Sequence, residues 1–124
     1  MVDRKPSGEA SAVTAGASSD CCSAGHSLSD SAVAADVETL ATLGNDTRYE
    51  ALRLIAGADD GVCVCELEPN LGVSQGAVSQ ALSRLFSAGL VERRKEGRWR
   101  YYTATPRAER LLRVLDETRE PGDE

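Results

Sequence analysis

Four cysteines are the residues of this sequence whose type and spacing point most directly to chemistry. Cys21 and Cys22 are adjacent, and Cys63 and Cys65 are separated by one residue. Adjacent Cα atoms lie about 3.8 Å apart, below the roughly 4.4 Å that an unstrained disulfide needs. We therefore expect free thiols, whose thiolate forms bind soft, thiophilic ions. Three sulfurs suit a trivalent metalloid such as arsenite, and four suit tetrahedral cadmium or zinc.

The second cysteine pair depends on the backbone around it. In a regular α-helix, residues two apart point about 200° away from each other and cannot bind one ion. Pro69 has no N–H to donate and fits only in the first turn of a helix, so we expect a helix that begins near Glu66. Cys63 and Cys65 would then lie on irregular backbone, where their sulfurs can converge, and the positive end of the helix would favour thiolates. The alternative is a buried structural pair, since free cysteine is often buried.

The sequence has little that would support an enzyme. A thiol nucleophile needs a base partner, and His26 is the only histidine of the chain. Its place four residues after Cys22 is more typical of a solvated tail residue than of a ligand. We therefore expect no catalytic residues and no small organic substrate or organic cofactor.

Helices that could position the second cysteine pair are predicted on both sides of it. Before it, apolar residues recur at helical spacing from residue 31 to Gly44, and Asn45 is the predicted N-cap of a helix that ends near Ala56. After it, Gly72 ends the short helix, and Ser74 caps a helix over residues 75–88. The apolar residues expected to face inward are Ala51, Leu52, Ile55, Val78, Leu82, Leu85 and Phe86. Two helices joined by a short turn containing glycine form a helix-turn-helix.

A β-hairpin and a final helix complete the predicted fold. Residues 90–104 alternate between two strands, with a turn over Lys95–Gly97. A last helix begins at Pro106 and carries an apolar stripe. The fold class is therefore mainly α with a small β-hairpin, a winged helix-turn-helix. We expect a flexible arm over residues 1–30, this domain over residues 31–119, and an acidic tail over residues 120–124.

The charge of the chain is unevenly distributed. The 124 residues carry a formal charge of −6, yet residues 74–104 contain six basic and two acidic side chains. A basic stretch in an acidic chain suits contact with phosphates, although a solvated charged face is the commoner explanation of a charge run. Because this stretch coincides with the second helix of the motif and the hairpin, we expect it to bind operator DNA rather than only protein. The predicted DNA-binding residues are Ser74, Gln75, Ser79, Gln80, Ser83, Arg84, Arg94, Lys95 and Arg98.

One winged helix reads too few bases for useful specificity, so we expect a homodimer. The apolar stripes of the first and last helices would meet across a two-fold axis. No apolar run approaches the ~20 residues of a membrane span, and residues 1–30 lack a continuous apolar segment typical of a secretion signal. These features predict a cytoplasmic protein without a membrane partner.

The motifs together resemble the ArsR/SmtB family of metal-responsive repressors. The similarity extends from about Val33 to Tyr102 and includes CVCEL at residues 63–67, SQGAVS at 74–79 and EGRWRYY at 96–102. The resemblance implies a dimeric winged-helix repressor that leaves its operator when metal binds, and a ligand role for Cys63 and Cys65.

The sequence also departs from this family. Arsenic sensors with a compact three-cysteine site have a further cysteine where this chain has Glu68. Cys21 and Cys22 resemble the arm ligands of members that join an N-terminal cysteine pair to the CVCEL box of the other subunit. Members that sense zinc use histidine on the last helix, and no histidine occurs between Pro106 and Glu124, so we expect no such site.

We hypothesise that As(III) or Sb(III) binds Cys63 and Cys65 together with Cys21 and Cys22, and that binding releases the operator and derepresses resistance genes. One alternative is a sensor of cadmium, lead, bismuth or zinc that uses the same thiols. Another is a repressor of the same fold that senses thiol oxidation through a disulfide between the arm and the box.

Overall fold

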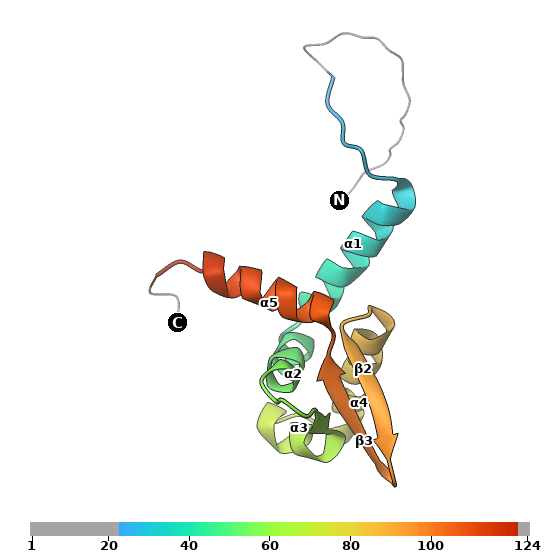
Figure 1. Cartoon of the computed structure of the whole chain (residues 1–124), viewed down its shortest axis with the longest axis vertical. Helices are drawn as coiled ribbons and strands as arrows, with labels where there is room; N and C mark the ends of the chain where they lie inside the picture. Colours follow the sequence, from blue (N-terminus) through green and yellow to red (C-terminus); the bar gives the residue numbers. More distant parts are fainter. Residues whose placement is uncertain (1–22, 122–124) are drawn as a thin grey trace. The chain divides into compact units, whose positions relative to one another are not determined.

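The computed structural model describes residues 23–121 of the chain (Figure 1). The chain divides into two compact units, Met1–Asp30 and Ser31–Glu124. Cys21 and Cys22 lie outside the described residues, so the flexible arm stays a prediction. The elements, in chain order, are α1 (Asp30–Leu43), α2 (Asp46–Ala56), β1 (Val62–Cys63), α3 (Val64–Leu71), α4 (Gln75–Ser87), β2 (Val91–Glu96), β3 (Trp99–Ala104) and α5 (Pro106–Thr118). The predicted mainly α-helical fold with a β-hairpin is confirmed.

The helices α2 and α4 begin where their capping residues predict. The Asn45 side chain accepts a hydrogen bond from the N–H of Arg48 at 3.0 Å, and the Ser74 hydroxyl accepts one from the N–H of Ala77 at 3.1 Å. Each bond satisfies a backbone donor that the first turn of a helix leaves without a partner. Local sequence thus determined both starting points.

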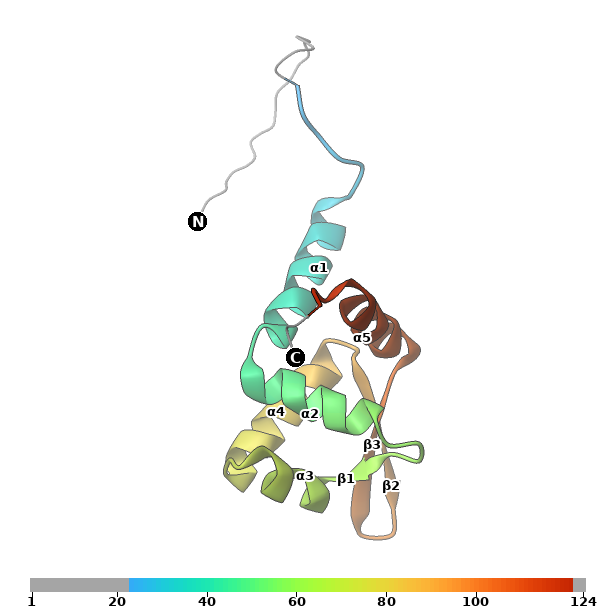
Figure 2. The same cartoon turned by 90° about the vertical axis from the view of Figure 1, so that its left-hand side faces the viewer.

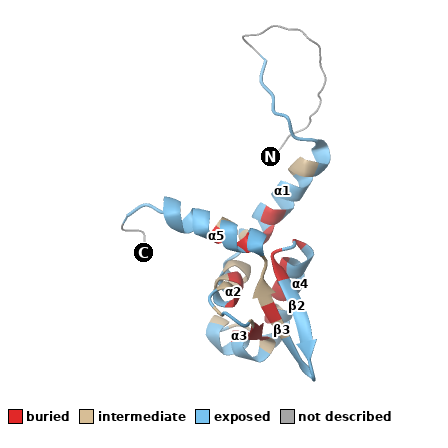
Figure 3. Ribbon diagram, viewed as in Figure 1, coloured by how far each residue is buried: buried red, intermediate tan, exposed pale blue. Residues whose placement is uncertain are grey.

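The core lies among α2, α3, α4 and the inner ends of the strands, coloured red in Figure 3. All the residues predicted to face inward from α2 and α4 are buried except Phe86, which is 40% exposed. The prediction for Phe86 was wrong, because this residue lies at the edge of the apolar face of α4. There the guanidinium carbon of Arg93 lies 4.1 Å from the centre of the Phe86 ring, and this cation–π contact covers the ring in place of the core.

The helix α3 begins earlier than predicted. It starts at Val64 rather than near Glu66, so Pro69 lies in its second turn. Cys63 is the N-cap, and its N–H donates to Glu66 Oε1 at 3.1 Å, which stabilises the helix start. Pro69 lacks the N–H that would reach the Cys65 carbonyl, and α3 tolerates this loss because it ends two residues later, at Leu71.

The turn of the hairpin is shorter than predicted, and a third strand joins the sheet. β2 and β3 pair from Val91 with Ala104 to Glu96 with Trp99, so the predicted turn at Lys95–Gly97 is displaced and Gly97–Arg98 form the turn. Gly97 has φ +63°, as the first turn residue of a type II′ hairpin requires. β1 was not predicted, because a strand of two residues is too short to show an alternation of apolar and polar side chains. β1 pairs with β3 and gives the sheet order β1-β3-β2 (Figure 2).

The helices α1 and α5 are only partly used by the core. α1 buries Thr39 and Thr42, whose hydroxyls donate to backbone carbonyls one turn earlier. α5 buries Ala108 and Leu112 and is linked to α1 by a 2.7 Å hydrogen bond from Arg107 to Thr39. Leu43 and Leu111 are half-buried against the core, whereas four other large apolar side chains of these helices are exposed by 43–67%: Val37, Leu40, Val114 and Leu115.

An ion pair holds the outer half of α5 to α2. Arg53 Nη2 lies 2.6 Å from Asp116 Oδ1, and Arg119 contacts the same oxygen at 2.9 Å. These guanidinium groups, Arg53 foremost, lower the pKa of Asp116 to about 2. The carboxylate therefore links α5 to α2 through a partly exposed ion pair, while Val114 and Leu115 on the outer face of α5 stay exposed among residues 23–121. Among residues 23–121 there is no helix that could span a membrane.

Candidate thiol site and nucleic-acid interface

The thiols of Cys63 and Cys65 converge where β1 passes into α3. Cys63 has extended backbone, with φ −72° and ψ 143°, and Cys65 is the second residue of the helix. Their Sγ atoms are 2.8 Å apart, and the Cys65 thiol donates a hydrogen bond to Cys63 Sγ. The change from strand to helix between them removes the divergence that a continuous helix would impose. Convergence therefore occurs although α3 begins earlier than predicted.

The two thiols differ in exposure. Cys63 is buried and Cys65 is exposed, so the pair is reachable from solvent and is only half buried. The hydrogen bond to Cys63 is the main cause that raises the pKa of the Cys65 thiol above its usual value. An ion that binds the Cys65 sulfur therefore has to displace a proton that this hydrogen bond helps to hold.

Two sulfurs at this spacing fit one soft ion but do not complete its coordination. With metal–sulfur bonds of about 2.3 Å, two ligands of one tetrahedral ion lie about 3.8 Å apart, so a separation of 2.8 Å needs only a small adjustment. In the described part of the chain, no three histidine, cysteine or acidic side chains gather as a metal site would require. His26 is used locally, since its Nδ1 accepts a hydrogen bond from the N–H of Leu28 at 3.0 Å. A further ligand must come from elsewhere.

The thiol pair opens into a pocket of about 460 Å³ that it shares with the hairpin and with the start of α4. β1 ends at Cys63, opposite Tyr101, while β3 continues outward to Trp99. The pocket lies where a longer β1 would have continued along β3. Its lining includes Glu68, Gln75, Lys95, Arg98, Trp99 and Arg100. Sequence reasoning missed the place of Trp99 and Arg100 in this pocket, because their closeness to the thiols depends on the register between β1 and β3.

The outer face of α4 is polar and solvent-exposed. Gln75, Ser79, Gln80 and Ser83 are all exposed, and such side chains can bond base edges in a DNA groove. Gln80, Ser83 and Arg84 also line a second pocket of about 460 Å³, together with Asn45, Thr47 and Arg48 from the start of α2. The sequence did not single out these α2 residues, because only packing of α2 against α4 brings them to this face.

Ser74 and Arg84 are predicted DNA-binding residues of the α4 region that already have partners within the protein. The Ser74 hydroxyl caps α4, and Arg84 lies 4.0 Å from the Glu38 carboxylate. A hydroxyl that accepts one bond can still donate another, and a half-exposed ion pair is weak. Both residues therefore remain available to a ligand.

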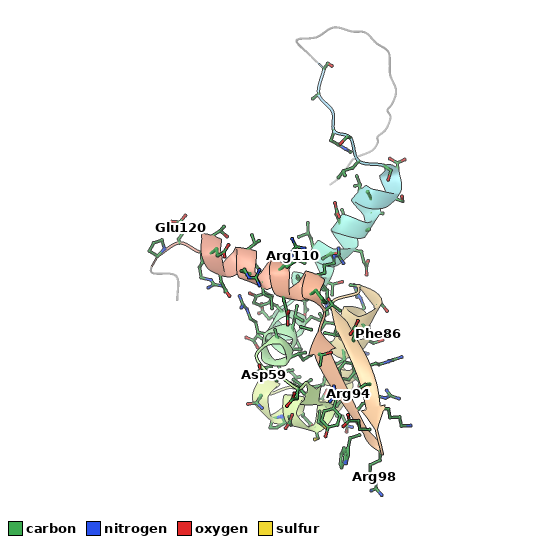
Figure 4. The ribbon with its side chains drawn as sticks, viewed as in Figure 1. Asp59, Phe86, Arg94, Arg98, Arg110 and Glu120 are labelled. Atoms are coloured by element: carbon green, nitrogen blue, oxygen red, sulfur yellow. The ribbon has the colours of Figure 1, made fainter. Side chains whose placement is uncertain are left out.

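The basic residues of the hairpin have different environments. Arg94 donates to Glu96 at 2.8 Å and to the backbone carbonyl of Asp60 at 3.1 Å, and so links the hairpin to the loop before β1 (Figure 4). Lys95 pairs across the strands with Arg100, which places like charges opposite each other. Arg98 lies in the turn at the tip of the hairpin. Three cations near the tip suit a polyanion, and the half-exposed Arg94 lies beside them although it also bonds Glu96 and the Asp60 carbonyl.

A polar helix of a helix-turn-helix beside a basic β-hairpin defines the winged-helix class of DNA-binding regulators. Residues 45–93 match the family model described as "Bacterial regulatory protein, arsR family". The chain is 60% identical over 103 residues to a Halobacterium salinarum protein, "Putative arsenical resistance operon repressor ArsR2", and the match covers 83% of this chain and 87% of the relative. The chain belongs to the ArsR family. It is accordingly a DNA-binding transcriptional regulator and not an enzyme.

Further relatives agree in sequence and in structure. A second Halobacterium salinarum protein, "Putative arsenical resistance operon repressor ArsR", is 48% identical over 71% of this chain and 68% of its own length. HlyU from Vibrio cholerae matches with a TM-score of 0.63 at 29% identity, over 72% of this chain and 96% of HlyU. The homodimeric winged helix-turn-helix DNA-binding domain of Mb0332 from Mycobacterium bovis matches with a TM-score of 0.65 at 26% identity, over 73% of this chain and 85% of that domain.

Replacing Cys63 with alanine removes the acceptor of the Cys65 thiol hydrogen bond. Because this bond raises the pKa of Cys65, we expect the pKa to fall in Cys63→Ala and iodoacetamide to alkylate Cys65 faster near neutral pH. Alkylation at Cys65, followed by peptide mass spectrometry across a pH series, measures the shift, with Cys22→Ser as the control. An unchanged pH profile would contradict a shared proton between the two sulfurs.

Proposed function

We propose that this protein is an arsenic-type repressor, which binds the operator of resistance genes as a homodimer in the cytoplasm and leaves it when As(III) or Sb(III) binds its thiols. The observation that carries the proposal is the 2.8 Å separation of the Cys63 and Cys65 sulfurs beside the hairpin and the start of α4. The Halobacterium salinarum relatives are named as putative arsenical resistance operon repressors, which supports arsenic as the inducing element. Cadmium, lead, bismuth and zinc are the alternative ions for the same thiols.

The proposed DNA interface consists of α4 and the hairpin. α4 would lie in the major groove, where glutamine can pair with adenine and serine with several bases, and the hairpin would lie along the neighbouring backbone. Arg94 would hold the hairpin in position through the Asp60 carbonyl. The residues proposed to contact DNA are Ser74, Gln75, Ser79, Gln80, Ser83, Arg84, Arg94, Lys95 and Arg98.

The proposed dimer uses the exposed apolar residues of α1 and α5. This surface contains large apolar side chains that water would otherwise surround: Val37, Leu40, Val114 and Leu115. A two-fold interface would bury the copies of these side chains from both subunits. The similar Mb0332 domain is a homodimer, which supports this arrangement. Two α4 helices could then contact half-sites about 34 Å apart on one face of the duplex.

The third sulfur is proposed to come from the arm over residues 1–30. A trivalent metalloid needs three donors, and the described residues supply two at this site. Cys21 and Cys22 are the remaining cysteines of the chain, and adjacent thiols cannot pair with each other without strain. We propose that one or both of them bind the ion, from the same subunit or from its partner.

Ion binding is proposed to act on the DNA interface through two short connections. An ion that separates the sulfurs from 2.8 Å to about 3.8 Å would act on the end of β1 and on the start of α3, where the two cysteines lie. β1 is hydrogen-bonded to β3 of the hairpin, and α3 and α4 pack in one core. A coupling free energy of about 1–3 kcal/mol per site is typical of such linkage, and two sites per dimer would double it.

Thiol oxidation is a second candidate, and the same sulfur separation favours it. Two thiols at 2.8 Å are close enough for a peroxide to convert them to a disulfide, either with each other or through the arm. Release of operator DNA by peroxide in metal-free buffer would support this candidate, and release by arsenite under reducing conditions would support the first.

The double variant Cys63→Ser/Cys65→Ser tests the proposed inducer site. Serine keeps the size of the side chains but does not bind soft ions, so we expect operator binding to be retained and release by arsenite to be lost. A mobility-shift titration of reduced protein with arsenite measures both. Release of the variant at the wild-type arsenite concentration would show that the site lies elsewhere.

The variant Lys95→Gln tests the contact between the hairpin and DNA. Loss of one phosphate contact should reduce the slope of log affinity against log salt by about 1 per wing. Arg113→Gln, which removes one exposed positive charge from α5, is the matched control and should leave the slope nearly unchanged. Equal effects of the two variants would mean that only net charge matters.

The variant Leu40→Glu tests the dimer surface. Leu40 is 67% exposed, so the fold of the subunit should tolerate the change, whereas a buried carboxylate at a two-fold interface should raise the dimer dissociation constant at least tenfold. Leu54→Glu, on α2, is the control at another exposed leucine. Sedimentation at several concentrations gives the constants, and a wild-type value for Leu40→Glu would remove this surface from the dimer.

A further inference from the structure

An arginine at the start of α5 contacts both the end of α4 and the middle of α1. Arg107, the second residue of α5, donates to the carbonyl of Ala88 at 3.1 Å and to the hydroxyl of Thr39 at 2.7 Å. Ala88 is the C-cap of α4, so its carbonyl is one of those that a helix end leaves without a partner in the helix. One guanidinium group therefore joins α4 to the two helices that the proposed dimer uses.

The chemistry of this bridge depends on the shape of arginine. Thr39 is 5% exposed, and its hydroxyl already donates to the Ala35 carbonyl at 3.1 Å, so towards Arg107 its oxygen acts as an acceptor. The guanidinium group has a planar fork of donors that can reach two acceptors on different elements, whereas the lysine ammonium is a single point. A bond from a charged donor is also stronger than a bond between neutral groups.

Other contacts limit movement of α5 along α4 but hold α1 less firmly. The Thr105 hydroxyl donates to the Gly89 carbonyl at 2.9 Å, and the Thr105 N–H donates to the Leu90 carbonyl at 3.1 Å. These bonds fix the start of α5 beside the segment that leaves α4. Between α1 and α4, Glu38 and Arg84 form a half-exposed ion pair at 4.0 Å, and such a pair is weak. The angle of α1 against α4 therefore depends on the bridge through Arg107.

This angle matters for DNA because the two functions lie on different helices. The proposed two-fold interface uses α1 and α5, whereas the proposed contacts to bases are on α4. One base pair inserted between two half-sites moves them about 3.4 Å apart and rotates them by about 35° relative to each other. A dimer whose α4 helices are held firmly against α1 and α5 cannot follow this change, whereas a loosened dimer can.

We infer that Arg107 is a positioning residue, which sets the half-site spacing that the dimer accepts through its bonds to Thr39 and Ala88. It acts by holding α4 at a fixed angle to the dimer helices rather than by reading bases. The inference rests on the proposed dimer of α1 and α5 and assigns the spacing of its operator to one side chain.

The variant Arg107→Met tests the inference in the full, reduced chain, because methionine keeps an unbranched apolar stem and has no donor. The probes are the palindromic duplex that wild-type protein selects from random DNA, the same duplex with one base pair inserted at its centre, and a duplex with a single half-site. The affinity ratio of the first two duplexes measures spacing selectivity. We expect this ratio to fall by about fivefold, as the loss of one hydrogen bond predicts. Affinity for the single half-site should stay within about twofold of wild type, as for a surface substitution. Mobility-shift titrations give the affinities.

Two further variants separate the bridge from charge and from general damage to the fold. Thr39→Val removes one acceptor of Arg107, so it should lower the spacing ratio as well. Together with Arg107→Met it should lower the ratio by less than the product of the single effects, because both changes break the same bond. Arg113→Met removes one exposed arginine from α5 and should leave the ratio unchanged.

The outcomes separate this inference from the proposed function. An unchanged spacing ratio in Arg107→Met, or equal losses of affinity for all three duplexes, overturns the positioning role, and so does an equal fall of the ratio in Arg113→Met. Fully multiplicative effects of Arg107→Met and Thr39→Val overturn the route through Thr39. Each of these results, found while sedimentation shows an intact dimer, counts against the inference alone. A wild-type dimer dissociation constant for Leu40→Glu would instead remove the proposed dimer surface, and the inference with it.

Discussion

The pairing of β1 with β3 is the interaction on which the arrangement of this protein depends. It is only two residues long, yet it places Val62 beside Tyr102 and Cys63 beside Tyr101. Val62 and Tyr102 are both buried and join the hairpin to the core. Because the chain turns into α3 directly after Cys63, the thiol pair lies beside the outer half of the hairpin and close to the start of α4.

This placement makes the distance between the proposed inducer site and the proposed DNA interface short. The same pocket is lined by Cys63 and Cys65, by Gln75 of α4, and by Lys95 of the hairpin. A change in sulfur separation therefore needs no long path through the protein to reach the residues proposed to contact DNA. The interior is closely packed and transmits small shifts of a helix or strand, so a displacement at α3 must be accommodated by its neighbours.

Much of the fold could be predicted because it is encoded locally. Asn45 and Ser74 begin helices through their own side chains, and the spacing of Leu52, Ile55 and Val78 identified buried faces that the structure confirms. The errors occurred where one residue was interpreted without the side chains that contact it. Pro69 indicated a late start of α3, but the Cys63 N-cap with its bond to Glu66 sets the start. The spacing of Phe86 predicted a core residue, but in the structure Arg93 of the neighbouring strand covers its ring.

The sequence by itself determined the helices, their caps, the basic hairpin and the two cysteines that can bind a soft ion, since residue type and spacing within one turn or one strand pair are enough for these. Only the tertiary structure decided that the sulfurs lie 2.8 Å apart, that Arg94 is bonded to the Asp60 carbonyl, and that Trp99 shares a pocket with the thiols. The physical reason is that the Arg94 bond and the position of Trp99 depend on hydrogen bonds and packing between residues more than thirty positions apart. Such contacts form only when the whole core assembles, so no local pattern records them.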